Sequence, residues 1–315
     1  MSASQDKKTK EGAQERERLK RRRASIARRR NEKILFDFGP PPPRKLDCPI
    51  VDAHTHPSTM KHADTLVRVA QSYGISKTLG ITSIEGAAEL EEAFPGFFAF
   101  AVSFSYNHLD DLPRFHQENL ALLDRAREAG FSIVKFWFKP EFNEATGLTL
   151  DDPRMDPLFD KMGKLGFSGL AHIADPDIWF VRRYGDSARF GTKQEAFIQL
   201  ENRLDSHTDV RLVGAHLGGD PEHLQHVAQL LNAHPNLAVD CSATKWVVRE
   251  LSQTPDEARR FFAAFQDRIV PVSCPALSGG CAGALREGIV KRNRPKCARS
   301  LWSKIQETTL TACLR

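Results

Sequence analysis

Short apolar runs alternate with longer amphipathic segments from residue 46 to residue 270, and this alternation constrains the fold more than any other feature. Strands that alternate with helices are typical of a parallel sheet covered by helices, the α/β class. Eight runs are candidate strands, at 49–53, 76–81, 97–104, 132–136, 167–172, 211–216, 237–240 and 268–270. The amphipathic stretches between them include 63–73, 112–129, 194–206, 221–231 and 256–266.

Two architectures of this class accommodate eight strands. Strict alternation favours a closed (β/α)8 TIM barrel, which commonly takes about 250 residues. An open doubly wound sheet is the alternative, but no nucleotide-binding glycine fingerprint follows the first predicted strand. Glycines stand where helices would end, at Gly74, Gly130 and Gly166. We therefore predict a TIM barrel.

Charge divides the chain into three parts. The first 33 residues hold 13 Lys and Arg against 5 Asp and Glu, and residues 271–315 hold 8 against 2, whereas residues 34–270 hold 24 against 33. The first part has too little apolar content to form a core, which predicts a disordered or helical basic arm. Four consecutive prolines after Gly39 then stop any helix. The predicted parts are a basic arm with a proline-rich spacer at 1–45, a barrel domain at 46–270 and an atypical C-terminal segment at 271–315.

Hydropathy and cysteine usage predict a cytoplasmic protein without a membrane segment. No apolar stretch approaches the roughly 20 residues that cross a bilayer, and the N-terminal residues are too charged for a signal peptide. Four of the six cysteines follow residue 270, and no CxxC spacing is present. We expect free thiols rather than a disulfide framework.

The segment Asp52-Ala53-His54-Thr55-His56 follows the short apolar run Ile50-Val51 in the first predicted strand. Residues two apart in a strand point to the same side, so His54 and His56 can direct two imidazoles at one point. Neutral imidazole binds zinc and its first-row neighbours, and such an ion makes bound water nucleophilic near neutral pH. Two histidines in a surface turn show the same spacing, so this pair needs support from the rest of the chain.

Polar residues at the ends of other predicted strands supply that support. Lys135 lies in the fourth strand, and His172, His216 and Asp240 end the fifth, sixth and seventh. Taken singly, a buried histidine is usually a hydrogen-bonded core residue, and a lysine in an apolar run usually reaches the surface. In TIM barrels, however, the C-terminal ends of the strands meet at one face and carry the catalytic groups. The joint placement predicts one shared pocket.

These residues resemble the motifs of the amidohydrolase superfamily, in particular its amidohydrolase-related branch of metal-dependent TIM-barrel hydrolases. The resemblance covers about residues 48–270 and rests on three features. They are Val-Asp-Ala-His-Thr-His-Pro at 51–57, His172, and Gly-Ala-His-Leu-Gly-Gly-Asp-Pro at 214–221.

The resemblance implies roles for five residues. His54, His56 and His172 would bind a divalent metal ion, usually Zn²⁺. His216 would be the catalytic base or a ligand of a second metal. Lys135 occupies the place of a lysine that bridges two metals in some members, although many members of this branch hold one.

Two carboxylates are candidates for supporting this site. Asp52 and Asp240 are placed to hold the imidazoles in position, and Asp240 is also a candidate catalytic residue. His223 and His226, three residues apart, could form another ligand pair, but a solvated helix face explains them better. Substrate-binding residues are not predicted, because they would lie in loops whose shape the sequence does not reveal.

The resemblance breaks at the eighth strand, where members of the family carry an Asp that binds the metal or activates its water. Here Val270 is followed by Pro-Val-Ser-Cys-Pro, and no acidic residue appears before Glu287. The simultaneous loss of motif and acidic composition is what a shifted reading frame would produce. Inspection of the coding DNA for a frame giving Phe-Gly-x-Asp after Val270 tests this hypothesis. Without that carboxylate we expect weak or absent activity, even with metal bound.

Three functions remain open. The first is a metal-dependent hydrolase, with metal-bound water attacking an amide, ester or lactone of a small molecule. The second is a lyase with the same site, a decarboxylase or hydratase of a small carboxylic acid. The third is a catalytically defective barrel that binds a partner through its basic arm. An arm without a specific ligand is favoured over one that binds nucleic acid. Association into a homo-oligomer is also left open.

Overall fold

The computed structural model describes residues 50–270, which belong to the second of two compact units, Pro41–Arg315. The predicted arm and spacer at 1–45 and the atypical segment at 271–315 lie outside the described residues. Within the described range, no helix is long and apolar enough to cross a membrane.

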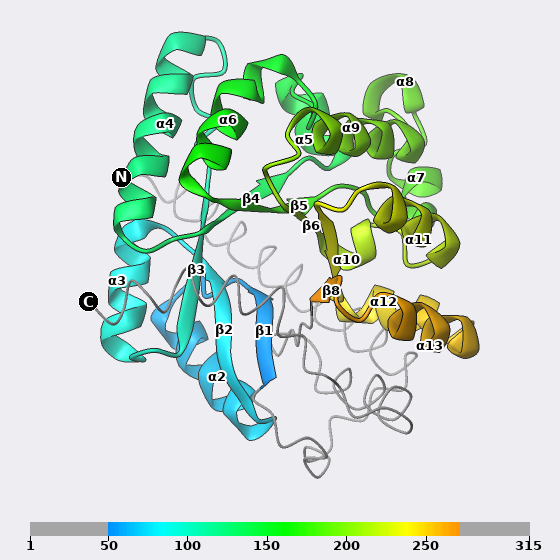
Figure 1. The fold of residues 1–315 in the computed structure, drawn as a ribbon, viewed down its shortest axis with the longest axis horizontal. Coiled ribbons are helices and arrows are strands. Elements are labelled where there is room, and N and C mark those ends of the chain that lie inside the picture. The colour runs from blue at the N-terminus through cyan, green and yellow to red at the C-terminus, as the bar shows by residue number, and fades with distance from the viewer. Residues whose placement is uncertain (1–49, 271–315) are drawn as a thin grey trace, which may run out of the picture. The chain divides into compact units, whose positions relative to one another are not determined.

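Eight parallel strands form one sheet in sequence order, so the predicted (β/α)8 arrangement is confirmed (Figure 1). Neighbouring strands pair from β1 through β8, and no β8–β1 pairing is found between residues 50 and 270, so the barrel is nearly closed. The strands are β1 Ile50–Thr55, β2 Ile75–Ile81, β3 Phe98–Ser103, β4 Ile133–Trp137, β5 Ser168–His172, β6 Leu212–Gly214, β7 Leu237–Asp240 and β8 Ile269–Val270.

Helices connect successive strands, and each of the five predicted amphipathic stretches contains one. They are α2 Met60–Ser72, α4 Leu112–Glu128, α9 Lys193–Ser206, α11 Leu224–Ala233 and α13 Pro255–Ala264. Further helices were not predicted, because most are short or lack a clear apolar face. These are α3 Ile84–Ala93, α5 Pro140–Thr146, α6 Asp156–Leu165, α7 Asp177–Arg182, α8 Ser187–Phe190, α10 Ala215–Gly218 and α12 Thr244–Leu251, with a 3₁₀ turn at Pro153–Met155.

Local sequence explains where several helices begin and end. Thr192 starts α9 by accepting the backbone N–H of Glu195, whose carboxylate accepts the backbone N–H of Thr192 in return. Gly74, Gly130 and Gly166 have φ between 71° and 83°, a conformation that favours glycine and stops a helix. The predicted glycine stops are therefore confirmed.

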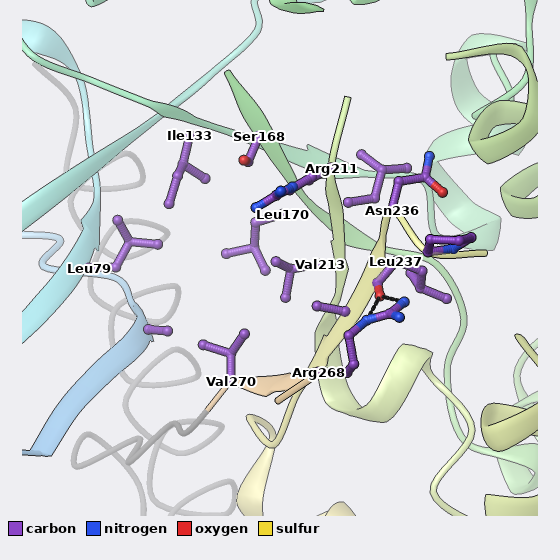
Figure 2. A pocket seen from close by; sticks show the side chains of 14 residues that line it. Leu79, Ile133, Ser168, Leu170, Arg211, Val213, Asn236, Leu237, Arg268 and Val270 are labelled. Atoms are coloured by element: carbon purple, nitrogen blue, oxygen red, sulfur yellow. Dashed lines mark hydrogen bonds between the residues drawn. The ribbon is translucent and has the colours of Figure 1, made fainter. Parts of the chain in front are cut away.

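Apolar side chains fill the barrel interior and the layer between strands and helices. Inside, Leu79, Ala101, Ile133 and Leu170 form one buried cluster. A small cavity of about 40 Å³ remains at the N-terminal ends of the strands, where Leu79, Leu170 and Val270 point toward one another (Figure 2). It is too small for a substrate and holds none of the predicted site residues. The predicted site residues lie at the opposite end, here called the mouth, which comprises the C-terminal strand ends and the loops that follow them.

Candidate metal centre

The end of β1 places His54 inside the barrel. The register between β1 and β2 shifts between Asp52 and Thr55, so strict alternation of side chains fails there. Ala53 contacts the interior residues Ala238 and Val270, and the His54 ring is also buried. Asp52, predicted to steady the imidazoles, accepts the backbone N–H of His54 at 3.1 Å and so supports the segment through its main chain.

Asp240, at the end of β7, holds the ring of His54. Its Oδ2 lies 2.8 Å from Nδ1 of His54, and an ionised carboxylate can only accept a hydrogen bond, so Nδ1 carries the proton. The Nε2 atom of His54 then keeps its lone pair. Nζ of Lys135 lies 3.4 Å from that Nε2, and the Lys135 side chain is 1% exposed. The predicted residues His54, Lys135 and Asp240 therefore meet at one place.

The four strand-end histidines lie in a row across the mouth. Ring centroids are 5.2 Å apart for His54 and His56, 5.6 Å for His54 and His216, and 5.0 Å for His216 and His172. Imidazoles bound tetrahedrally to one zinc ion have centroids roughly 3.2 Å from the metal and so about 5.2 Å from each other. Neighbouring rings therefore have the separation that a metal site requires.

His216 does not continue β6, as the predicted strand 211–216 would require, because β6 ends at Gly214. His216 and Leu217 have φ of 62° and 56°, and Gly218 and Gly219 follow in the same left-handed region. A Cβ on Gly219 would lie 2.6 Å from the backbone oxygen of Ala174, so only glycine fits there. This turn presents the backbone N–H of His216 to Oδ1 of Asp240 at 2.7 Å. Asp240 thus binds elements on both sides of the mouth.

His172, at the end of β5, is held by a second carboxylate. Its Nε2 lies 3.1 Å from Oδ1 of Asp175, which leaves Nδ1 facing away from that contact. Oδ2 of Asp175 and Oε2 of Glu141 each lie 2.8 Å from the buried hydroxyl of Tyr184. The ring of His172 is therefore oriented by a chain of contacts that reaches α5.

Burial favours the neutral form of His54, His56 and His216. Burial and the neighbouring Lys135 lower the pKa of His54, and burial and His172 lower that of His216 well below its ordinary value. Partial burial and His54 also lower the pKa of His56, and burial lowers the pKa of Lys135 to about 7. Burial alone would raise the pKa of Asp240, but His54, His216 and Ser242 together outweigh it, and the net shift is downward. A neutral imidazole is the form that binds a metal ion.

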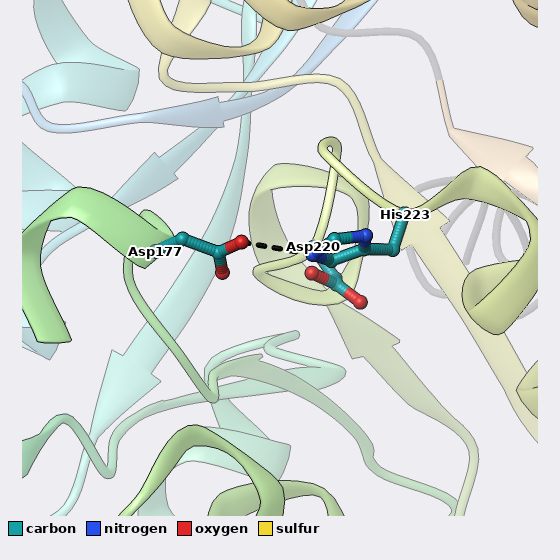
Figure 3. A group of neighbouring side chains, drawn as sticks. All are labelled: Asp177, Asp220 and His223. Carbon is teal, nitrogen blue, oxygen red and sulfur yellow. Dashed lines mark hydrogen bonds and ion pairs between the residues drawn. The ribbon is translucent and has the colours of Figure 1, made fainter.

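A separate group of metal-ligand side chains lies beside this row. Among the residues that the structure describes, Asp177, Asp220 and His223 alone have ligand atoms all within 4.8 Å of one another (Figure 3). Nζ of Lys193 lies 2.5 Å from Asp177 and 2.7 Å from Asp220, so an ammonium group already balances this charge. His223 and His226 pair with the same two carboxylates. We read this group as an ion-pair network.

The ligand atoms in the row of histidines lie farther apart than those of Asp177, Asp220 and His223. The nitrogens of His54, His56 and His172 do not all lie within the same 4.8 Å limit, so their rings must turn toward a common point to share an ion. Their donor chemistry suits a divalent ion, because burial favours the neutral form of His54 and His56, and His54 and His172 each have a carboxylate on one ring nitrogen.

Comparison with known proteins identifies the family. The family model described as amidohydrolase matches residues 81–270. The chain belongs to the amidohydrolase family. The predicted resemblance is thereby confirmed, and it assigns this amidohydrolase to a superfamily of metal-dependent enzymes. No curated protein sequence matches the chain.

Solved structures share the fold of this amidohydrolase at low sequence identity. A 4-oxalomesaconate hydratase, LigJ, from Rhodopseudomonas palustris has a TM-score of 0.59 and 15% identity, over 84% of this chain and 97% of its own. The 5-carboxyvanillate decarboxylase LigW from Sphingomonas paucimobilis has 0.52 and 12%, over 83% and 99%. A manganese-bound 5-carboxyvanillate decarboxylase from Novosphingobium aromaticivorans has 0.51 and 12%, over 82% and 94%.

Several residues of the amidohydrolase site were not predicted. Ser242 contacts both His54 and His216, and Tyr184 contacts Asp175. Trp137 ends β4, and its ring lies 5.9 Å from that of His56 in a stacked arrangement. Asp175, three residues after His172, offered a sequence signal, whereas no local pattern marked Ser242 or Tyr184.

An open cavity of about 380 Å³ lies beside the row of histidines at the mouth. His56 and Trp137 form one wall of it. The other lining residues come from the ends of β2 and β3 and from α3 and α4, and they include Thr82, Ser103 and Arg125. The cavity is large enough for a small molecule and adjoins a predicted metal ligand.

Proposed function

We propose that this amidohydrolase holds a divalent metal ion at the barrel mouth through His54, His56 and His172 and acts on a small molecule. Two observations carry the proposal: the rings of His54 and His56 lie at metal-compatible spacing, and the rings of His54 and His172 are held by Asp240 and Asp175. Zn²⁺ is our first candidate because imidazole ligands suit it. Bound there, the ion would polarise a carbonyl and lower the pKa of water.

We assign proton transfer to His216. Its Nδ1 contacts Ser242, and its Nε2 remains as the lone pair that could accept a proton from a reacting group. Asp240 supports both His54 and His216 and so fixes the geometry between the metal ligands and the base. Lys135 is the candidate for a bridge to a second ion, since its Nζ adjoins His54.

Hydrolysis of an amide, ester or lactone is the first candidate reaction. Decarboxylation or hydration of a small carboxylic acid is the second, because the related folds include a hydratase and two decarboxylases. We place the substrate in the cavity beside His56 and Trp137. Assays of carboxylate release against ester and lactone cleavage, with metal-loaded protein, separate the two reactions.

The missing strand-eight Asp bears on how active this chain is. β8 ends at Val270, and the residues after it lie outside the described range. We keep the proposal that turnover is weak or absent without that carboxylate. We also propose a shifted reading frame, and the absence of Phe-Gly-x-Asp after Val270 from every alternate frame of the coding DNA would contradict it. A defective barrel that binds a partner through its basic arm remains the rival proposal, and deletion of residues 1–33 with binding assays tests it.

Elemental analysis tests the metal site directly. We expect the double variant His54→Ala/His56→Ala to lose bound metal at least tenfold relative to the wild type after zinc loading and dialysis. His62→Ala is the matched control, because His62 lies close by in α2 but contacts Ser58 and belongs outside the row. Equal metal content in the wild type and the double variant would overturn the proposal.

A further inference from the structure

We infer that Ser242 is a positioning residue that, together with Asp240, sets which nitrogen of His216 carries the proton. The use of this arrangement in catalysis rests on the proposed function. The arrangement itself rests only on the contacts between these side chains.

Ser242 follows β7, and its side chain is 3% exposed. Its Oγ lies 2.6 Å from Nδ1 of His216 and 3.1 Å from Nδ1 of His54, and it makes a short contact with Oδ1 of Asp240. A hydroxyl group has one proton to donate, so at most one of these three contacts can use it.

The proton of Ser242 must go to Asp240. Two backbone N–H groups already donate to Oδ1 of that carboxylate, from His216 at 2.7 Å and from Ser242 at 2.8 Å. An ionised carboxylate has no proton to offer, so the short contact between the two oxygens requires the hydroxyl as donor. The Oγ atom can then only accept from His216, and Nδ1 of His216 must carry a proton. The lone pair of His216 is thereby fixed on Nε2.

One carboxylate consequently orients two histidines. Oδ2 of Asp240 accepts Nδ1–H of His54 directly, and Oδ1 reaches Nδ1–H of His216 through Ser242. The two rings lie nearly parallel, at an interplanar angle of 15°. Both Nε2 lone pairs are then left for chemistry, one for the metal and one for proton transfer.

Strained backbone conformations lie at these contacts, which supports a functional role for the arrangement. Within residues 50–270, the non-glycine residues with positive φ are His216, Leu217 and Ala243. All three flank the contact between His216 and Ser242. A left-handed conformation is unfavourable for a non-glycine residue, and such strain collects where function requires it.

The tautomer of His216 can be observed without metal or substrate. We expect ¹⁵N NMR of histidine-labelled, metal-free protein to show the Nδ1–H form of His216, with its signals assigned by their loss in His216→Gln. In Ser242→Ala the Nδ1 atom loses its acceptor, so His216 should shift to the Nε2–H form or to a mixture. His54 should keep its Nδ1–H form, because Asp240 still holds it. Ser242→Thr retains a hydroxyl and should restore the wild-type spectrum.

Ser206→Ala is the matched control. Its Oγ lies 2.9 Å from Nδ1 of His207 in the outer helix layer, so this variant removes a serine beside a histidine away from the mouth. It should leave the signals of His216 unchanged.

Two results would overturn the inference. One is a wild-type spectrum with the proton of His216 on Nε2, which decides the matter even if Ser242→Ala does not fold. The other is an unchanged Nδ1–H form in folded Ser242→Ala. Failure of metal binding would refute the proposed function and leave this measurement valid, so the two failures are distinguishable. Where metal binds, we expect Ser242→Ala to weaken Zn²⁺ affinity less than twofold if His216 is only a base, and about tenfold or more if it ligates a second ion.

Discussion

Oδ2 of Asp240 lies 2.8 Å from Nδ1 of His54, although 186 positions separate the two residues in the chain. The contact joins β7 to β1 across the barrel and holds the imidazole of a proposed metal ligand. Because both partners are almost fully buried, the contact is shielded from water and from salt.

Replacing Asp240 by Asn tests the value of this contact. The amide NH₂ group of this variant would face N–H and O–H groups from which the carboxylate now accepts hydrogen bonds. We therefore expect about 10–100-fold weaker metal binding. We also expect a loss of about 1–3 kcal/mol in the free energy of unfolding. Zinc titration and urea unfolding measure the two effects. Asp64→Asn is the control, since Asp64 is 59% exposed and pairs with Arg68 on the surface of α2, and it should change neither quantity appreciably.

Lys135 gives a prediction about pH. Burial lowers its pKa from 10.5 to about 7, so between these pH values the unfolded chain binds a proton that the folded chain lacks. Stability of the metal-free protein from this group therefore rises with pH from 7 to 10.5, and the cost of burying the charge is fully present below pH 7. Lys135→Met removes that cost. At pH 6 we expect the free energy of unfolding of this variant to exceed that of the wild type by a few kcal/mol, at about 1.4 kcal/mol per pKa unit. Near pH 10.5 the two free energies should be equal.

Urea unfolding at pH 6, 8 and 10.5 measures the difference in free energy of unfolding between Lys135→Met and the wild type. Lys61→Met is the control, because the side chain of Lys61 is exposed on α2, and its difference from the wild type should stay flat. A stability difference for Lys135→Met that does not change with pH would contradict the prediction.

Alanine variants of Gly219 and Gly130 distinguish the cost of backbone strain from the cost of a steric clash. Both have φ of 83°, but a Cβ on Gly130 would meet nothing within 4 Å, whereas one on Gly219 would meet the backbone oxygen of Ala174 at 2.6 Å. We expect Gly130→Ala to cost about 1–2 kcal/mol, the price of a left-handed alanine. Gly219→Ala should cost more and also reduce metal binding, because the turn that carries His216 must move. Equal costs in urea unfolding would argue against the clash.

Removal of the hydroxyl group should change stability in different ways at Tyr184 and at Tyr106. The hydroxyl of Tyr184 contacts Asp175 and Glu141, so Tyr184→Phe should destabilise the protein by about 1–3 kcal/mol and loosen His172. The hydroxyl of Tyr106 is buried and finds no hydrogen-bond partner in the described part of the chain. Tyr106→Phe should therefore be neutral or stabilising. Thermal and urea unfolding of both variants check the signs, and destabilisation of similar size in both would refute this account.

The barrel could be predicted from the sequence because each strand is a short apolar run bounded by polar or glycine residues. The gathering of His54, His172, His216 and Asp240 at one end followed from the rule that parallel strands end together. Short helices such as α3 and α12 escaped prediction, because stretches of 10 and 8 residues contain only about two to three helical turns in which to show a pattern.

The details of the site depend on contacts that no local pattern reveals. Gly214, Ala215 and His216 continue an apolar run and looked like strand, but the left-handed turn there is held by Asp240. Ser242 and His54 are 188 positions apart, so their contact exists only in the folded chain. The register shift in β1 likewise overrode the alternation expected around His54.

The aromatic neighbours of the histidine row give the protein a built-in optical reporter. Of its four tryptophans, Trp137 at the end of β4 stacks on His56, and Trp246 in α12 lies 6.1 Å from the ring of His216. Imidazole protonation and ion capture alter emission from an adjacent indole. Fluorescence of the unlabelled chain can thus register events at His56 and at His216 in real time.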